Sequence, residues 1–194
     1  MNFVSIIKIE KMKDKIYNWL QRIDQQTDRV NTFFGKLTDE QLYRKPGEKI
    51  WSIAENLQHL IVINNSYFPA IETIRAGKQK LGFLSKFAFI RKFFGKMIIA
   101  GVQADRKKKM KTFAVWQPAH FKSSENLIET FVKHQESIKK LISDSEDLLL
   151  KNAIIASPAN KNIVYSLADA FEIIVTHEER HVNQAAELLK VQNN

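Results

Sequence analysis

Cysteine is absent from this chain of 194 residues. Disulfide bonds and thiolate ligands are therefore excluded, and any transition-metal site has to be built from nitrogen and oxygen atoms. A reducing cytoplasm suits a chain of this composition, and we expect a cytoplasmic location.

Long uninterrupted apolar runs are absent as well. The most apolar segment, residues 83–102, contains Lys86, Arg91, Lys92 and Lys96, and a bilayer-spanning helix does not tolerate charges at that density. The N-terminal stretch MNFVSIIKIEKMKDK has a short apolar run, no basic residues before it and no small-residue cleavage site. We expect neither a membrane span nor a signal peptide.

Acidic residues are fewer than basic ones, 21 against 30, which gives a net charge of +9. This balance permits weak, salt-sensitive attraction to nucleic acid or anionic membranes but does not define a function. Part of the excess of basic residues lies in residues 106–111, within the stretch DRKKKMK. Because no recognised nucleic-acid module accompanies that run, we interpret it as a solvated face and expect neither nucleic acid nor a membrane as a partner.

Four segments show apolar residues at spacings of three, four and seven, the pattern of amphipathic helices. They run from about residue 6 to Gly35, from Ser52 to about Ala76, from Ser123 or Ser124 to about Ser143, and from Ser166 onward. The serines at the starts of the last three segments are expected N-caps. No segment shows a convincing strand pattern. The sequence predicts an all-α fold, with residues 1–194 forming a single domain built as a four-helix bundle.

The connections carry further signals. Thr38 with Gln41, and Ser52 with Glu55, have the spacing of capping boxes. Residues 78–111 form an additional helical segment, aromatic and basic, between the second and third long helices, and its glycines are expected to divide it into short pieces. We expect it to cover the bundle end, line the mouth of a pocket or form a dimer contact; a membrane-surface element is the alternative.

Two histidines stand out in the stretch FEIIVTHEERHVNQ. His177 and His181 lie four residues apart, so both project from one face of the last helix. They interrupt an apolar stripe, where an imidazole without a partner would cost stability. A zinc-type site needs at least three protein ligands, and His59, beside the core stripe of the second helix, can lie opposite the pair in a bundle. The competing interpretation is three histidines satisfied by ordinary hydrogen bonds.

Three neutral imidazoles would leave one coordination position for water or substrate, the arrangement of catalytic metal sites. Glu55, four residues before His59, and Gln184, three after His181, have the spacing to orient the imidazoles. For Glu55 we favour the capping-box role.

Other candidates are interpreted more plainly. His120 and His134 are expected to be solvated, with His120 a possible contact for a substrate, and Trp51 is expected to pack as the apolar residue before an N-cap. The catalytic residues are unknown, since the sequence offers no convincing general acid or base and no nucleophile beside a base.

The stretch LTDEQLYRKPGEKIWSIAENLQHL resembles the N-terminal signature of the DinB/YfiT-like metal-binding family, and RHVNQ after His177 resembles its C-terminal signature. The resemblance implies a four-helix bundle, often a homodimer, whose three histidines bind zinc, nickel or a similar divalent ion. It also implies a possible activity. Characterised relatives include S-transferases and isomerases that activate a low-molecular-weight thiol at the metal, while many members have no known reaction.

Two hypotheses of function follow. The first is a metal-dependent enzyme in which the ion held by His59, His177 and His181 activates a thiol or water for transfer or hydrolysis on a small electrophilic substrate. The second is a non-catalytic, stress-related metal-binding protein that acts through a protein partner.

Overall fold

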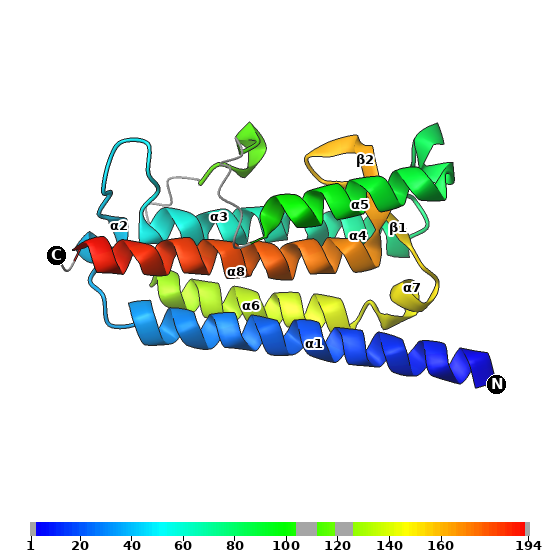
Figure 1. Cartoon of the computed structure of the whole chain (residues 1–194), viewed down its shortest axis with the longest axis horizontal. Helices are drawn as coiled ribbons and strands as arrows, with labels where there is room; N and C mark the ends of the chain where they lie inside the picture. The colour runs from blue at the N-terminus through cyan, green and yellow to red at the C-terminus, as the bar shows by residue number, and fades with distance from the viewer. Residues whose placement is uncertain (1–2, 104–111, 119–125, 193–194) are drawn as a thin grey trace.

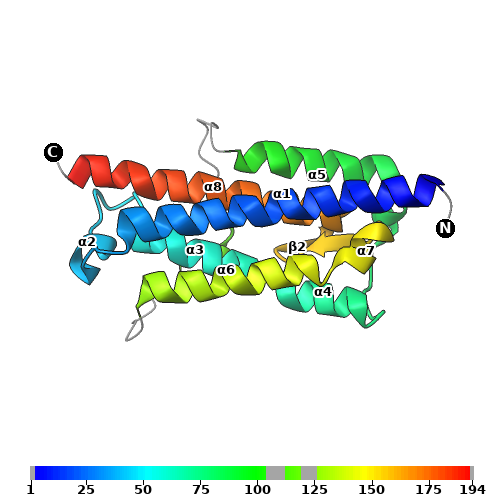
Figure 2. The same cartoon turned by 90° about the horizontal axis from the view of Figure 1, so that it is seen from below.

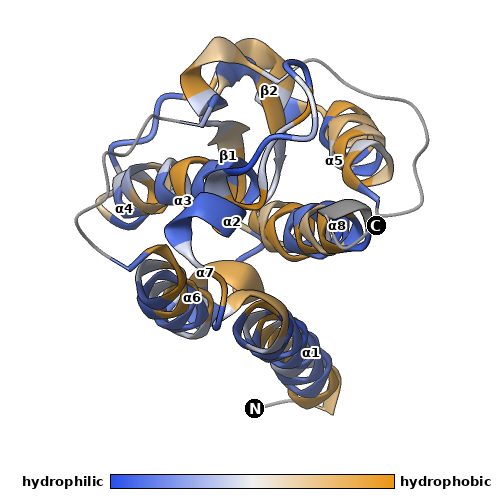
Figure 3. Cartoon of the chain, turned by 90° about the vertical axis from the view of Figure 1, so that its left-hand side faces the viewer, coloured by the Kyte–Doolittle hydropathy of each residue, from blue (hydrophilic) through white to orange (hydrophobic). Residues whose placement is uncertain are grey.

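The computed structural model describes residues 3–103, 112–118 and 126–192. Its main body is a bundle of four long helices (Figure 1). These are α1 (Phe3–Phe34), α3 (Ile53–Asn65) with its continuation α4 (Tyr67–Arg75), α6 (Leu127–Ser143) and α8 (Leu167–Gln192). Seen from one end, they surround a common core (Figure 3). The predicted helical bundle is confirmed.

The capping signals formed as the sequence indicates. Gln41 N donates to Thr38 Oγ1 over 3.3 Å at the start of α2 (Asp39–Tyr43), and Glu55 N donates to Ser52 Oγ over 3.1 Å at the start of α3. Ser166 Oγ accepts from Asp169 N over 3.0 Å and caps α8. For α6 the N-cap is Asn126, while Ser123 and Ser124 lie outside the described residues.

The second long helix is interrupted at Ser66, contrary to the prediction of one continuous helix. Its hydroxyl donates to the carbonyl of Ile63 over 2.5 Å, and α4 begins at the next residue. Pro69 stands in the first turn of α4, where its missing N–H removes no helical hydrogen bond. Proline is tolerated there, whereas within an unbroken helix it would have cost a bond.

The prediction that the chain has no strand is wrong. Residues Ile154–Ser157 form β1 and residues Asn160–Ser166 form β2, an antiparallel hairpin in which Ile155 lies opposite Tyr165. The predicted polar loop is only the tight turn between the strands. The alternation of buried and half-buried residues covers four residues in β1, too few for a clear period-two signal. Contact with α4 and α5 on the outside of the bundle completes the burial of the hairpin.

The segment between the second and third bundle helices contains η1 (Phe83–Lys86), α5 (Ala88–Val102) and η2 (Ala114–Trp116). Helix α5 packs along α8 and β2 (Figures 1 and 2). The expectation that glycines divide this segment is wrong for Gly95, which lies inside α5. A Cβ built there would come within 2.6 Å of Asp169 Oδ2, so this glycine permits the close approach of α5 to α8. Among the described residues, no helix is both long enough and apolar enough to span a bilayer.

A charged cluster fixes the rotation of α8 against α1. Arg22 donates to Glu172 and to both oxygens of Glu179, with distances of 2.7 to 2.9 Å, and Trp19 Nε1 donates to Glu172 over 2.8 Å. These carboxylates raise the pKa of Arg22 further. With Glu172 and Glu179 held toward α1, the face of α8 that carries His177 and His181 is directed toward α3.

The core is divided by a polar layer. Thr27, Asn64, Gln135 and Glu178 are buried, and each comes from a different helix of the bundle. On every helix the layer residue lies between members of two separate hydrophobic clusters. Asn64 Nδ2 donates to Glu178 Oε1 over 2.7 Å, but among the described residues Glu178 Oε2, Asn64 Oδ1 and both amide atoms of Gln135 have no hydrogen-bond partner within 3.5 Å. The layer is therefore incompletely satisfied by protein groups and is a weak point of the core.

His134 lies beside this layer, and the prediction that it is solvated is wrong. It is buried, its Nε2 has no hydrogen-bond partner in the part of the chain that the structure describes, and its ring centroid lies 6.3 Å from that of Phe68. The helical pattern placed it among polar neighbours, but the position faces α4. Burial lowers the pKa of His134 to about 4.

The pKa of His134 predicts a specific loss of stability in acid. The folded protein resists protonation between pH 6.5 and 4 while the unfolded chain does not, so stability falls as the pH is lowered through that window. The cost between pH 8 and pH 5 is about 2 kcal/mol. His134→Gln should therefore lose about 2 kcal/mol less than the wild type over that interval. Urea unfolding of metal-free protein at both pH values measures this, and equal losses in the two proteins would contradict it.

Candidate metal centre

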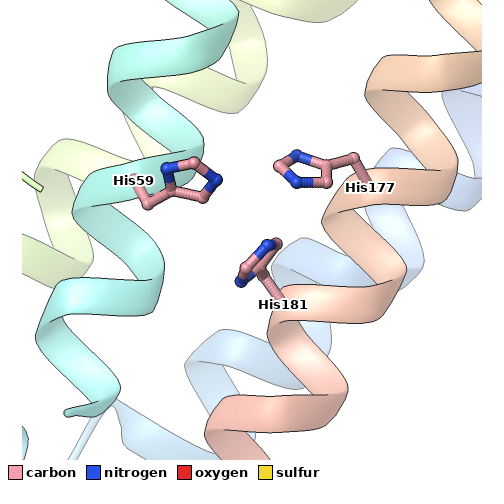
Figure 4. Close-up of side chains that lie close together, drawn as sticks. All are labelled: His59, His177 and His181. Atoms are coloured by element: carbon pink, nitrogen blue, oxygen red, sulfur yellow. The ribbon is translucent and has the colours of Figure 1, made fainter. Parts of the chain in front are cut away.

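Three imidazoles converge in the interior of the bundle. His59 projects from α3, and His177 and His181 project from adjacent turns of α8 toward it (Figure 4). Their ring centroids lie 4.4 to 5.1 Å apart, and each offers a nitrogen within 4.8 Å of the others. The three side chains are 2 to 8% exposed. The structure thus brings together the three histidines that the sequence nominated.

Hydrogen bonds fix the tautomers of two of these histidines. His59 Nδ1 lies 2.6 Å from the backbone oxygen of Trp116, and a carbonyl can only accept, so this nitrogen carries the proton. His181 Nδ1 lies 2.8 Å from Asn56 Oδ1, whose orientation is fixed because Asn56 Nδ2 donates to Ser52 O. In both rings Nε2 is left with a free lone pair, the form that ligates a metal.

His177 is different, because its buried Nδ1 has no hydrogen-bond partner among the described residues. An orphaned buried nitrogen costs free energy that a metal bond or a hydrogen bond to water would remove. The unpartnered nitrogen of His177 and the two free Nε2 lone pairs of the other imidazoles together fit a divalent ion that prefers nitrogen ligands.

The electrostatics of the cluster favour neutral rings. Burial lowers the pKa of His59 to about 4, against the opposing effect of its bond to Trp116. Burial also lowers the pKa of His177 and His181 well below the ordinary value, and the neighbouring histidines and Arg180 add to the shift. All three rings are therefore uncharged at neutral pH, which is the state that metal ligation requires.

The sequence did not identify the groups that hold the imidazoles. Glu55 accepts from Ser52 N and Lys45 Nζ, both over 2.8 Å, as the capping-box interpretation expects. Gln184 lines the adjoining cavity. The imidazoles are held instead by Asn56 and by the carbonyl of Trp116. Asn56 on α3 holds His181 on α8, and the carbonyl of Trp116 in η2 holds His59, so both partners come from other elements and leave no local signal in the sequence. His120 lies outside the described residues.

Trp51 covers the cluster. Its ring lies 4.8 Å from His59 and 5.7 Å from His181, centroid to centroid. The residue one turn into α3 that a hydrophobic staple would use is Asn56, which is polar. Trp51 thus packs, as predicted, but its partners are the imidazoles of His59 and His181.

A cavity of about 1000 Å³ adjoins the three histidines. Its walls come from α3, α4, α5, α8, the hairpin and the residues around η2. Apolar side chains predominate, and the charged ones are Lys49, Arg180 and Glu187. Arg180 Nη1 donates to Gly101 O over 3.0 Å and thereby joins α8 to α5 at the cavity wall. The size is that of a typical small-molecule site.

A helical bundle with three buried imidazoles beside a cavity defines a bundle protein whose core can hold a metal ion. The chain belongs to the DinB superfamily, which residues 22–185 match. No curated protein and no solved structure matched the sequence.

Proposed function

We propose that this protein is a metal-dependent enzyme that activates a thiol or water for attack on a small electrophilic substrate, in the manner of an S-transferase or hydrolase. The single observation that carries the proposal is the buried triad, with two Nε2 lone pairs left free by hydrogen bonds, beside a cavity of about 1000 Å³. His59, His177 and His181 would hold the ion, for which zinc and nickel are the leading candidates.

A divalent ion at this site would supply Lewis acidity and lower the pKa of a thiol or water. The residues of the chain provide the surroundings. Trp51 packs on two of the imidazoles and limits the access of bulk water. Arg180 adds a positive charge beside the triad, which favours a substrate or thiol that bears an anionic group.

Two tyrosines in the cavity wall are suited to donate rather than to accept protons. The hydroxyls of Tyr67 and Tyr165 lie 3.0 Å apart, and burial raises the pKa of both. They therefore stay neutral.

Glu187 is the only carboxylate among the described lining residues, and it is exposed. This lack of a buried base is the reason for assigning the activation of the nucleophile to the metal.

The test is a screen of metal-loaded protein with small thiols and model electrophiles such as chlorodinitrobenzene, and with esters for hydrolysis. His181→Ala serves as the blank and His134→Gln as the matched control, since both remove a buried histidine but only the first belongs to the triad. We expect turnover in the wild type and in His134→Gln and none in His181→Ala. Turnover equal in all three would overturn the proposal. Metal binding without turnover would favour the non-catalytic alternative.

A further inference from the structure

An exposed apolar surface lies on η1 and α5, away from the bundle core. Six large side chains form what we call the aromatic face: Phe83, Leu84, Phe87, Phe89, Phe93 and Met97, with exposures from 37 to 70%. Along α5 its members stand four residues apart, so they form a continuous stripe. The ring centroids of Phe83 and Phe87 lie 5.2 Å apart, and those of Phe87 and Phe89 lie 5.9 Å apart. These contacts extend the stripe onto η1. A contiguous patch of this kind marks an interaction site, which scattered apolar residues do not.

The charges that η1 and α5 themselves carry beside the aromatic face have one sign. Lys86, Lys92 and Lys96 are exposed beside it, and Lys86 Nζ lies 5.4 Å from the ring centroid of Phe83. The sequence from residue 73 to residue 103 contains no aspartate or glutamate. An apolar line with cationic flanks is the surface expected of a helix that lies in the plane of a bilayer carrying anionic lipids.

Other occupants fit less well. In a twofold dimer the same face would meet itself, which would bring lysines against lysines with no acid on η1 or α5 to pair them. Nucleic acid would neutralise the lysines but would leave most of the six apolar side chains in water. A bilayer surface satisfies both features, because the phosphates meet the lysines while the rings enter the region beneath them.

We propose that the aromatic face is a peripheral docking surface for anionic lipid bilayers. The sequence held a membrane-surface element only as the alternative for this segment, since periodicity could not show which side of the segment faces solvent. Met97 belongs both to this face and to the lining of the cavity beside the histidines. The aromatic face therefore borders the cavity at Met97.

The test is co-sedimentation of the full chain with vesicles of phosphatidylcholine, with and without phosphatidylglycerol. We expect binding to the anionic vesicles that weakens as salt is added. Phe89→Ser with Phe93→Ser should reduce the partition coefficient about tenfold, and Lys92→Gln with Lys96→Gln about 30-fold. The matched controls are Tyr17→Ser, an exposed aromatic on α1, and Lys11→Gln with Lys13→Gln on the same helix. They should bind as the wild type does.

Three results would overturn the proposal. The first is that the protein sediments equally with neutral and anionic vesicles, or sediments with neither. The second is self-association that Phe89→Ser with Phe93→Ser abolishes while vesicles recover no wild-type protein, which would assign the face to a second copy. The third is binding to a labelled oligonucleotide in place of vesicles. Circular dichroism of each variant shows whether it is folded. His181→Ala should bind vesicles normally, so failure of the enzymatic proposal leaves this one intact.

Discussion

Reconstitution of metal-free protein with zinc or nickel is expected to load one ion per chain and to raise its thermal stability, and His181→Ala is expected to abolish both effects. The physical reason is that the triad is buried, neutral and partly unsatisfied, most clearly at His177 Nδ1. A ligand that binds only the folded state, at a free concentration about 1,000 times its dissociation constant, adds about 4 kcal/mol to the free energy of unfolding. For a domain of this size that corresponds to roughly 10 °C in the melting temperature.

Elemental analysis of protein prepared without a metal-binding tag gives the stoichiometry, and thermal unfolding with and without a chelator gives the stabilisation. His134→Gln is the matched control, because it removes a buried histidine that lies outside the triad. It should load metal as the wild type does. Retention of a full equivalent of metal by His181→Ala would refute the assignment of the triad as the ligand set.

Glu178→Gln is expected to raise the free energy of unfolding of metal-free protein by about 3 kcal/mol at pH 8, and by only about 1 kcal/mol at pH 5. Burial raises the pKa of Glu178 to about 7, and the nearby side-chain amides of Gln135 and Asn64 only partly offset this. Between pH 4.5 and pH 7 the folded protein therefore holds a proton that the unfolded chain releases. The stability contributed by Glu178 is complete below that window and is lost as the pH rises through it. Glutamine cannot ionise and escapes this loss.

The matched control is Glu179→Gln, the next residue along α8. Its carboxylate is half-buried and accepts two hydrogen bonds from Arg22, so its removal should destabilise the protein at both pH values. Urea unfolding at pH 5 and pH 8 compares the two variants. A loss of stability in Glu178→Gln at pH 8 would mean that the Glu178 carboxylate is ionised and well satisfied in the folded core, and the prediction would fail.

Features that depend on a few neighbouring residues were predictable. The capping boxes at Thr38 and Ser52 formed because the cap and its partner lie three residues apart, within one helical turn. The burial of one face of α3 is predictable for a similar reason, since helical spacing alone places Leu57, Leu60 and Asn64 on one face, and all three are buried. Local geometry fixes such contacts wherever the helix forms.

Features that depend on packing between distant segments were missed. Gly95 appeared to break a helix, but its role is set by the approach of Asp169 from α8. His134 appeared solvated because its sequence neighbours are polar, yet α4 covers it. The hairpin of β1 and β2 is short, so four residues of alternation could not predict it. Its strand pairing and its contacts with α4 and α5 stabilise it.

The sequence by itself determined that His177 and His181 share one face of a helix, because a spacing of four fixes that in any α-helix. With the family resemblance, it also nominated His59 as their partner. Only the tertiary structure decided how the imidazoles are held. The carbonyl of Trp116 and the amide of Asn56 fix the two tautomers, and burial from all sides keeps the rings neutral. Hydrogen-bond partners from other elements and exclusion of water are properties of the packed chain, which no local spacing encodes.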